Sequence, residues 1–212
     1  MNKEFRKTLQ SAIRDNRSRG SVGEFLKEKI LPGSKLLAVS AYFTIYAYEQ
    51  LKDKLRGIDH LNFLYGEPTS IKKLDPDKTE TKYFEIADTK IALKNRPQQK
   101  TIAKECADWI KEKVNIKSIK QANLLHGKMY HIDNNGVEEA IMGSSNFTVK
   151  GLGLSLNNNI ELNLEVDSKR DRNDLKDWFY EIWNNDEIVE DVKDEVLAYL
   201  ARPSQFEGCI SR

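Results

Sequence analysis

The chain has 212 residues, of which 39% are hydrophobic and 32% are charged, and its formal net charge is +1. That length supports one sizeable hydrophobic core, so we expect a single domain. A net charge this close to zero gives no global sign of a nucleic-acid or membrane partner. No apolar run approaches the length of a membrane span, and the N-terminal MNKEFRKTLQ lacks an apolar signal core. We therefore expect a cytoplasmic protein without a membrane segment.

Charge is distributed unevenly along the chain. Residues 90–128 contain 10 Lys and Arg against 3 Asp and Glu, whereas residues 161–199 contain 5 against 13. These segments would give the folded domain one basic and one acidic face, unless its helices simply carry solvated charge. Cys106 and Cys209 are too far apart in sequence to suggest a metal knuckle, and we expect Cys106 to be a small buried side chain.

The first third of the chain predicts a helix, a strand, a second helix and a second strand. Ser21, with Glu24 three positions later, is a capping-box pattern that starts the first helix. KLLAVSAYF is typical of a buried strand, IYAYEQLKDKL returns to helical spacing, and HLNFLYG is a further strand. This alternation favours a layered α/β sheet.

The middle of the chain predicts a long connection and then a helix. Residues 68–98 contain three of the five prolines and many charges, so we expect surface structure or a mobile loop there. KYFEIA is a weak strand candidate inside this connection. Apolar residues then recur at helical spacing from residue 99 to residue 114.

The last part of the chain predicts a hairpin, a strand and two helices. KMYHID and EEAIMG are joined by Asn-Asn-Gly, and Asn-Gly favours tight hairpin turns because it tolerates positive φ. ELNLEV is a later strand, and helices follow over roughly 170–184 and 187–200. The core candidates of the first of these helices are Trp178, Phe179, Ile182 and Trp183.

The expected domain covers residues 1–200. Residues 201–212 have no hydrophobic periodicity, so we expect an unstructured tail or the start of a missing segment.

A histidine and a lysine lie two residues apart at the start of the predicted hairpin. If the strand begins at His126, then His126 and Lys128 share one face with Tyr130, and Asp133 lies on the other face. An imidazole can attack phosphorus or transfer a proton, and a neighbouring lysine can bind a phosphate oxygen as a point charge. This pair is therefore a sensible phosphate site.

Small polar residues follow the second strand of the hairpin. Gly143-Ser144-Ser145-Asn146 offers an amide donor and backbone N–H groups, which suit an anionic ligand. Further on, Glu161 could accept a hydrogen bond from an imidazole and fix its tautomer. The plainer alternatives are a strand-edge histidine with a solubilising lysine, a simple turn and a polar strand end.

Together these residues resemble the phospholipase D superfamily. HGKMYHID is similar to the superfamily's HxKxxxxD signature, and GSSN is similar to its GSxN-type extension. GSSNFT followed by Glu161 resembles the nuclease branch, which includes domains of bacterial endonucleases and of helicase- or restriction-associated proteins. The resemblance implies a phospholipase D-like α/β fold, with a mixed central β-sheet flanked by α-helices and one motif per chain.

The resemblance also implies a role for each residue. His126 would attack phosphorus and form a phosphohistidine, while Lys128 and Asn146 would hold the phosphate oxygens. Ser144 is a further possible phosphate contact, and Glu161 would orient a catalytic histidine. The structural residues of the motif would be Asp133 and Gly143.

A second histidine motif is missing from the sequence. Sites of this superfamily use one histidine as nucleophile and another as general acid, but neither His60 nor His131 begins a second His-x-Lys. Single-motif members form homodimers with a shared site, so we expect a two-fold symmetric dimer. We expect no metal and no other cofactor, because lysine, asparagine and imidazolium supply the positive field. His131 with Asp133 could form a metal-ligand pair, but a structural histidine is the favoured reading.

The predicted function is cleavage of single- or double-stranded DNA, leaving by resemblance a 5′-phosphate and a 3′-hydroxyl. Basic residues before the motif would track the DNA backbone, and they include Lys111, Lys113, Lys117 and Lys120. One alternative is a phospholipid phosphodiesterase. Another is a DNA-binding or targeting module of a longer helicase or restriction system, whose motor would lie elsewhere because this chain has no P-loop sequence.

Overall fold

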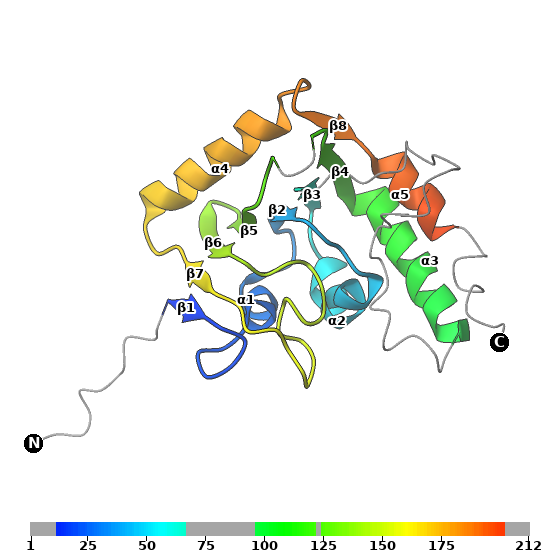
Figure 1. The fold of residues 1–212 in the computed structure, drawn as a ribbon, viewed down its shortest axis with the longest axis horizontal. Coiled ribbons are helices and arrows are strands. Elements are labelled where there is room, and N and C mark those ends of the chain that lie inside the picture. Colours follow the sequence, from blue (N-terminus) through cyan, green and yellow to red (C-terminus); the bar gives the residue numbers. More distant parts are fainter. Residues whose placement is uncertain (1–11, 67–95, 122–123, 202–212) are drawn as a thin grey trace, which may run out of the picture.

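The computed structural model describes residues 12–66, 96–121 and 124–201, which form one mixed β-sheet with helices on both faces (Figure 1). In chain order the elements are β1 (Ile13–Arg14), α1 (Val22–Lys29), β2 (Lys35–Ser40), α2 (Ile45–Leu55), β3 (His60–Tyr65), α3 (Arg96–Lys113), β4 (Val114–Ile119), β5 (Lys128–Asn134), β6 (Val137–Gly143), β7 (Asn163–Glu165), α4 (Lys169–Trp183), β8 (Val189–Asp191) and α5 (Lys193–Leu200). The strands lie in the order β1-β7-β6-β5-β2-β3-β4-β8. The predicted α/β class with a mixed central sheet is confirmed.

The strand directions bring several strand ends to one edge of the sheet. β2, β3 and β4 are parallel, while β5 is antiparallel to β2, β6 to β5 and β7 to β6. The carboxyl ends of β2, β3, β4 and β6 therefore meet the amino ends of β5 and β7, and we call this the site edge. The opposite edge, which holds the β5–β6 turn, is the turn edge. Ligands of open α/β sheets bind beyond the carboxyl ends of the parallel strands.

Two hydrophobic clusters cover the two faces of the sheet. The larger includes buried residues of α1, α2, α3 and α5, among them Tyr48 and Trp109. The smaller packs Phe179 and Trp183 of α4 against residues of the central strands, including Met129. Figure 1 shows α4 on one side of the sheet and α1 and α2 on the other. Burial of both faces explains why β2 and β3 read as nearly continuous apolar runs.

The first two helices begin where the sequence predicts. The Ser21 hydroxyl accepts a hydrogen bond from the Glu24 N–H at 3.1 Å, and the Glu24 carboxylate accepts one from the Ser21 N–H at 2.9 Å. The Thr44 hydroxyl accepts one from the Ala47 N–H at 3.2 Å at the start of α2. These caps satisfy amides that a first helical turn leaves without partners.

The predicted elements differ from the structure around β4. The helix predicted over 99–114 begins at Arg96 and leads directly into β4, which the sequence analysis missed. The helix predicted over 187–200 is wrong in its first part, because Val189–Asp191 forms β8 along the outer side of β4. A strand of three residues is too short to show a period of two, and pairing with β4 decides its conformation.

Most predictions for individual core residues are confirmed. Phe179 and Trp183 are buried, whereas Trp178 and Ile182 are partly buried at the edge of the smaller cluster. Cys106 is fully buried, and burial raises the pKa of its thiol. KYFEIA, Cys209 and residues 202–212 lie outside the described residues, so the division into a domain of 1–200 and a tail stays a prediction.

Within the described ranges, no helix has the length and apolar character needed to cross a membrane.

Candidate functional site

The β5–β6 hairpin brings the two halves of the motif together at the site edge. Asn135 and Gly136 both have positive φ, 54° and 93°, as the predicted Asn-Gly turn requires. The register of the two strands pairs Lys128 with Gly143 at the far end of the hairpin. The HGK and GSSN sequences therefore lie side by side.

His126 and Lys128 lie at the start of β5. The strand begins at Lys128 rather than at His126, so strand alternation does not fix the direction of the imidazole, contrary to our expectation. Alternation does hold from Lys128 onward, because Tyr130 packs in the larger cluster and Met129 in the smaller one. His126 is exposed, and the Lys128 ammonium donates to the His126 carbonyl oxygen at 2.8 Å. Both side chains are thus at the surface of the site edge.

Asp133 lies at the other end of β5, on the turn edge. Its carboxylate accepts a hydrogen bond from the Gly136 N–H at 2.6 Å and so stabilises the hairpin turn. The register of β5 places it five pairs away from Lys128 and Gly143. This placement supports the structural role that the resemblance implied for Asp133.

Gly143 lies where β6 and β7 approach each other closely. A Cβ at this position would lie 2.6 Å from the Asn163 Cα and closer still to the Leu162 carbonyl oxygen. Backbone atoms cannot move aside as a flexible side chain can, so only glycine fits here. The structural role expected for Gly143 thus has a steric reason.

The carboxylate of Glu161 lies against Ser144. The Ser144 hydroxyl donates to this carboxylate and accepts a hydrogen bond from the Leu162 N–H at 3.0 Å. The other carboxylate oxygen of Glu161 accepts from the Asn159 side chain at 3.2 Å. The Ser144 proton is directed at Glu161 in this arrangement, and the contact of Ser144 with phosphate stays a prediction. The orienting role of Glu161 toward histidine stays a prediction.

The amide of Asn146 has one defined orientation. Its Oδ1 accepts hydrogen bonds from the Ala41 N–H at 3.0 Å and from the Ser40 hydroxyl at 3.2 Å. Because the oxygen is held by the end of β2, the nitrogen Nδ2 points in the opposite direction within the amide plane. None of the described residues accepts a hydrogen bond from Nδ2, so the described part of the fold does not use this donor.

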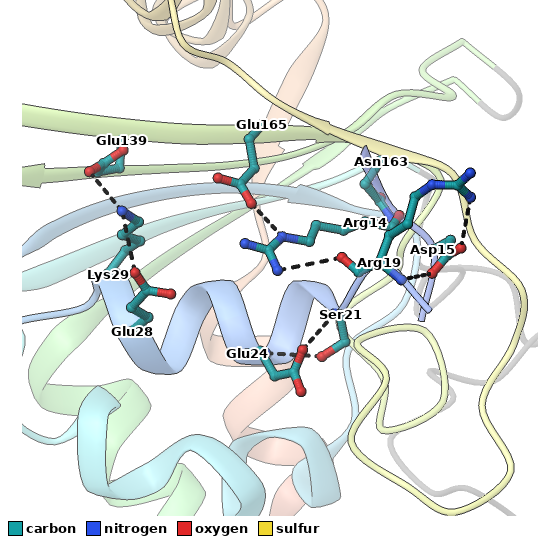
Figure 2. A network of polar contacts seen from close by, with 10 residues as sticks. All are labelled: Arg14, Asp15, Arg19, Ser21, Glu24, Glu28, Lys29, Glu139, Asn163 and Glu165. Carbon is teal, nitrogen blue, oxygen red and sulfur yellow. Dashed lines mark hydrogen bonds and ion pairs between the residues drawn. The ribbon is translucent and has the colours of Figure 1, made fainter. Parts of the chain in front are cut away.

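Buried polar residues that the sequence did not single out hydrogen-bond to the GSSN turn and stabilise it. The Asn163 amide accepts from the Ser145 N–H at 3.2 Å and donates to the Ser145 hydroxyl at 2.9 Å. It also donates to the Arg14 carbonyl at 3.2 Å, and Figure 2 shows Arg14 in turn paired with Glu165. The Tyr130 hydroxyl donates to the Ser145 carbonyl at 2.9 Å. No spacing in the sequence singles out these residues from other polar ones.

The other two histidines lie away from the site edge. His60 begins β3 on the turn edge, where its ring contacts Asp59 at 3.2 Å. His131 is buried below α4, with its Nε2 at 3.9 Å from the Glu138 carboxylate. Burial lowers the pKa of His131. The favoured structural reading of His131 agrees with this placement, and one chain brings one imidazole, that of His126, to the site edge.

The four basic residues expected to track DNA do not lie together. Lys111 and Lys113 end α3, which leads into the amino end of β4, and so belong to the turn edge. Lys117 contacts the Trp183 carbonyl at 2.9 Å and the Trp183 ring at 5.3 Å. Lys120 follows the carboxyl end of β4. Of the four, Lys120 lies at the site edge, where its ammonium donates to the Asp186 carbonyl oxygen.

The described residues contain no group of three or more His, Cys, Asp or Glu that could hold a metal ion. The candidate site consists instead of the His126 imidazole, the Lys128 ammonium and the Asn146 amide. This is a set that offers a nucleophile and two donors to an anion.

The fold is similar to part of a solved structure. The structure of the polyphosphate kinase from Porphyromonas gingivalis aligns with a TM-score of 0.50 and 12% sequence identity, over 82% of this chain and 22% of the kinase chain. An identity this low shows a common fold only. The chain therefore corresponds to about a fifth of that larger protein.

The family follows from the sequence match. The family described as "Cardiolipin synthase, PLD-like domain" matches residues 67–183, which is more than half of the chain and includes the whole candidate site from His126 to Glu161. The chain therefore belongs to this phospholipase D-like family, as the motif predicted. No curated protein matches it.

Proposed function

We propose that the protein is a metal-independent phosphodiesterase that cuts DNA through a covalent phosphohistidine. The observation that carries this proposal is the Asn146 amide: its oxygen is held at 3.0 Å from the Ala41 N–H, so its nitrogen is left as a donor in the turn that follows Gly143, the strand partner of Lys128. Two donors and a nucleophile at one sheet edge suit a phosphodiester.

The reaction would proceed in two steps. A His126 nitrogen attacks phosphorus, a P–N bond forms, and the bond from phosphorus to the leaving 3′-oxygen breaks. The leaving oxygen takes a proton from a second imidazole, which then activates the water that hydrolyses the P–N bond. Lys128 and Asn146 stabilise the charge that develops on the non-bridging oxygens. The products are a 5′-phosphate and a 3′-hydroxyl.

A second copy of the chain would supply the second imidazole. The three histidines of the sequence include one at the site edge, so the general acid must come from elsewhere. Apolar side chains are exposed next to Glu161, with Ile160 and Leu162 at 69% and 67% exposure. Burial of these side chains would favour self-association beside the site. The change Leu162→Asp should therefore give monomers in light scattering and abolish cleavage, and an active monomer would contradict the dimer.

A phospholipid phosphodiesterase is the second candidate function. The description of the family that matches the chain names a lipid enzyme, cardiolipin synthase. The same residues would carry out the same attack on phosphorus. We favour DNA because GSSNFT and Glu161 resemble the nuclease branch and because the chain has a single motif. A cytoplasmic location is part of this proposal.

The test is cleavage of plasmid and single-stranded DNA in EDTA, with the His126→Ala protein purified in parallel. Metal-free cutting that the variant lacks would support the proposal, and DNA binding should weaken as salt rises. Vesicles of phosphatidylglycerol and cardiolipin serve as the alternative substrate. Turnover of these lipids without DNA cleavage would move the assignment to the lipid enzyme.

A further inference from the structure

The position of Asn146 depends on two buried polar side chains from different strands. Ser40, at the end of β2, is fully buried, and Asn163, at the start of β7, is 3% exposed. Neither belongs to the motif, and neither can reach solvent to bind a substrate. Buried polar groups are costly unless they are hydrogen-bonded, so their partners explain what they do.

Ser40 holds the residue that follows Asn146. Its hydroxyl oxygen accepts a hydrogen bond from the Phe147 N–H at 2.9 Å. Its single proton lies between the Tyr42 carbonyl at 2.7 Å and the Asn146 Oδ1 at 3.2 Å. One serine thus connects the end of β2 to the Asn146 amide and to the backbone of the next residue, Phe147.

Asn163 holds the residue that precedes Asn146. Its amide binds both the N–H and the hydroxyl of Ser145, at 3.2 and 2.9 Å, while its remaining bond to the Arg14 carbonyl, at 3.2 Å, connects it to β1. Figure 2 shows Asn163 in the polar network that fastens the N-terminal strand to the sheet. Ser145 itself is fully buried, so it serves the turn and not the ligand.

We propose that Ser40 and Asn163 are positioning residues that fix the Asn146 amide with its nitrogen toward the substrate. The two side chains hydrogen-bond to the residues on either side of Asn146, and these bonds restrict the backbone conformation of Asn146. The bonds from Ala41 and Ser40 to Oδ1 then decide which end of the amide faces the site. An amide free to flip would present its oxygen to the phosphate, and two oxygens would repel. This inference rests on the proposed function, because it assumes that Asn146 holds phosphate.

The chain contains a matched control for Ser40. Ser34 is equally buried, precedes the same strand at the turn edge, and also contacts an asparagine side chain, that of Asn134. Its hydroxyl further binds the backbone of Leu31, accepting at 2.9 Å and donating at 2.6 Å. Ser34→Ala therefore removes a comparable set of hydrogen bonds at the other end of β2. It should cost similar stability without touching the site.

The first test measures kcat/KM for DNA cleavage in Ser40→Ala, Asn163→Ala and Ser34→Ala, each well below its unfolding temperature. We expect the first two to lose about 10- to 100-fold, mainly in kcat, because small displacements of a catalytic group have effects of this size. Ser34→Ala should keep the wild-type value. In the Asn146→Ala background, neither Ser40→Ala nor Asn163→Ala should reduce the rate further. Additive losses, or an equal loss in Ser34→Ala, would overturn the proposal.

The second test does not depend on cleavage. Inorganic phosphate is titrated into the isotope-labelled protein, and its dissociation constant is measured for the wild type and the same variants. Weaker binding in Ser40→Ala and Asn163→Ala, with Ser34→Ala unchanged, supports the positioning role even if no DNA is cut, in which case only the proposed endonuclease fails. Equal phosphate affinity in all proteins, or no binding by the wild type, overturns the positioning role.

Discussion

The site edge and the turn edge of the sheet use polar side chains in opposite ways. At the turn edge, Asp133 accepts a hydrogen bond from the Gly136 N–H and Asn134 contacts Ser34, so these polar groups stabilise the fold itself. At the site edge, Asn146 has its oxygen engaged and its amide nitrogen left over. The same residue types thus stabilise the fold at one edge and remain available to a ligand at the other. A hydrogen-bond donor that has no partner within the fold therefore indicates a ligand site better than the type of residue does.

Among changes at the site edge, removal of the nucleophile should reduce activity most. His126→Ala should reduce DNA cleavage by about 10⁴-fold or more, because no other group of one chain can form the phosphohistidine. Cleavage assays measure the rate, and denaturation at alkaline pH with a substrate labelled at its scissile phosphate retains the covalent adduct for detection. His60→Gln, on the turn edge, is the matched control and should keep wild-type activity. A His126→Ala protein that retains its rate would remove the nucleophile assignment.

Reversal of the donor at Asn146 should have the next largest effect. Asn146→Asp keeps an oxygen that can accept from the Ala41 N–H, but it replaces the free amide nitrogen with a second, anionic oxygen. We expect kcat/KM to fall by about 10²- to 10³-fold, as when one donor to a developing oxyanion is lost. The folding should stay intact by circular dichroism. Asn134→Asp is the corresponding change at the turn edge. If both variants cleave equally well, the contrast between the edges has no functional meaning.

The two glycines of the motif should respond differently to a methyl group. Gly143→Ala should destabilise the protein by about 1–3 kcal/mol, because the added Cβ meets the backbone of Leu162 and Asn163. Gly127→Ala should change stability by less than about 0.5 kcal/mol, since a Cβ there meets no atom within 4 Å. Urea denaturation of both variants checks the pair. Equal destabilisation would show that the close approach of β6 and β7 is not rigid.

Much of this architecture follows from local sequence signals. The capping box at Ser21, the apolar runs of β2 and β3, and the Asn-Gly turn each specify their element through short-range physics, and each prediction is confirmed. The HGK and GSSN sequences also lie side by side as expected, because the hairpin register follows from the turn.

The support of the site does not follow from such signals. Ser40 reads as the end of an apolar strand, and Asn163 as one polar residue in an alternating segment, until the chain brings them beside a turn more than 100 positions from Ser40. The sequence does not predict β8 for the same reason, since the conformation of this strand depends on its pairing with β4. Contacts between distant segments depend on the packing of the whole sheet, so a local sequence pattern cannot predict them.

The smallest predicted effect concerns the face of the sheet below α4 and its response to acid. His131 is buried there beside Glu138, which is paired with Lys176 of α4, and burial lowers the pKa of His131 below its usual value of 6.5. Above that value both folded and unfolded chains hold the ring neutral. As the pH falls below it, the unfolded chain takes up a proton that the folded protein resists, so stability decreases until the lowered pKa of the folded state is reached.

The slope can be at most about 1.4 kcal/mol per pH unit for one proton. Urea denaturation at pH 7.5 and 5.5 measures this loss, which should be smaller in His131→Gln than in the wild type. An equal loss in both proteins would assign the acid sensitivity to other groups.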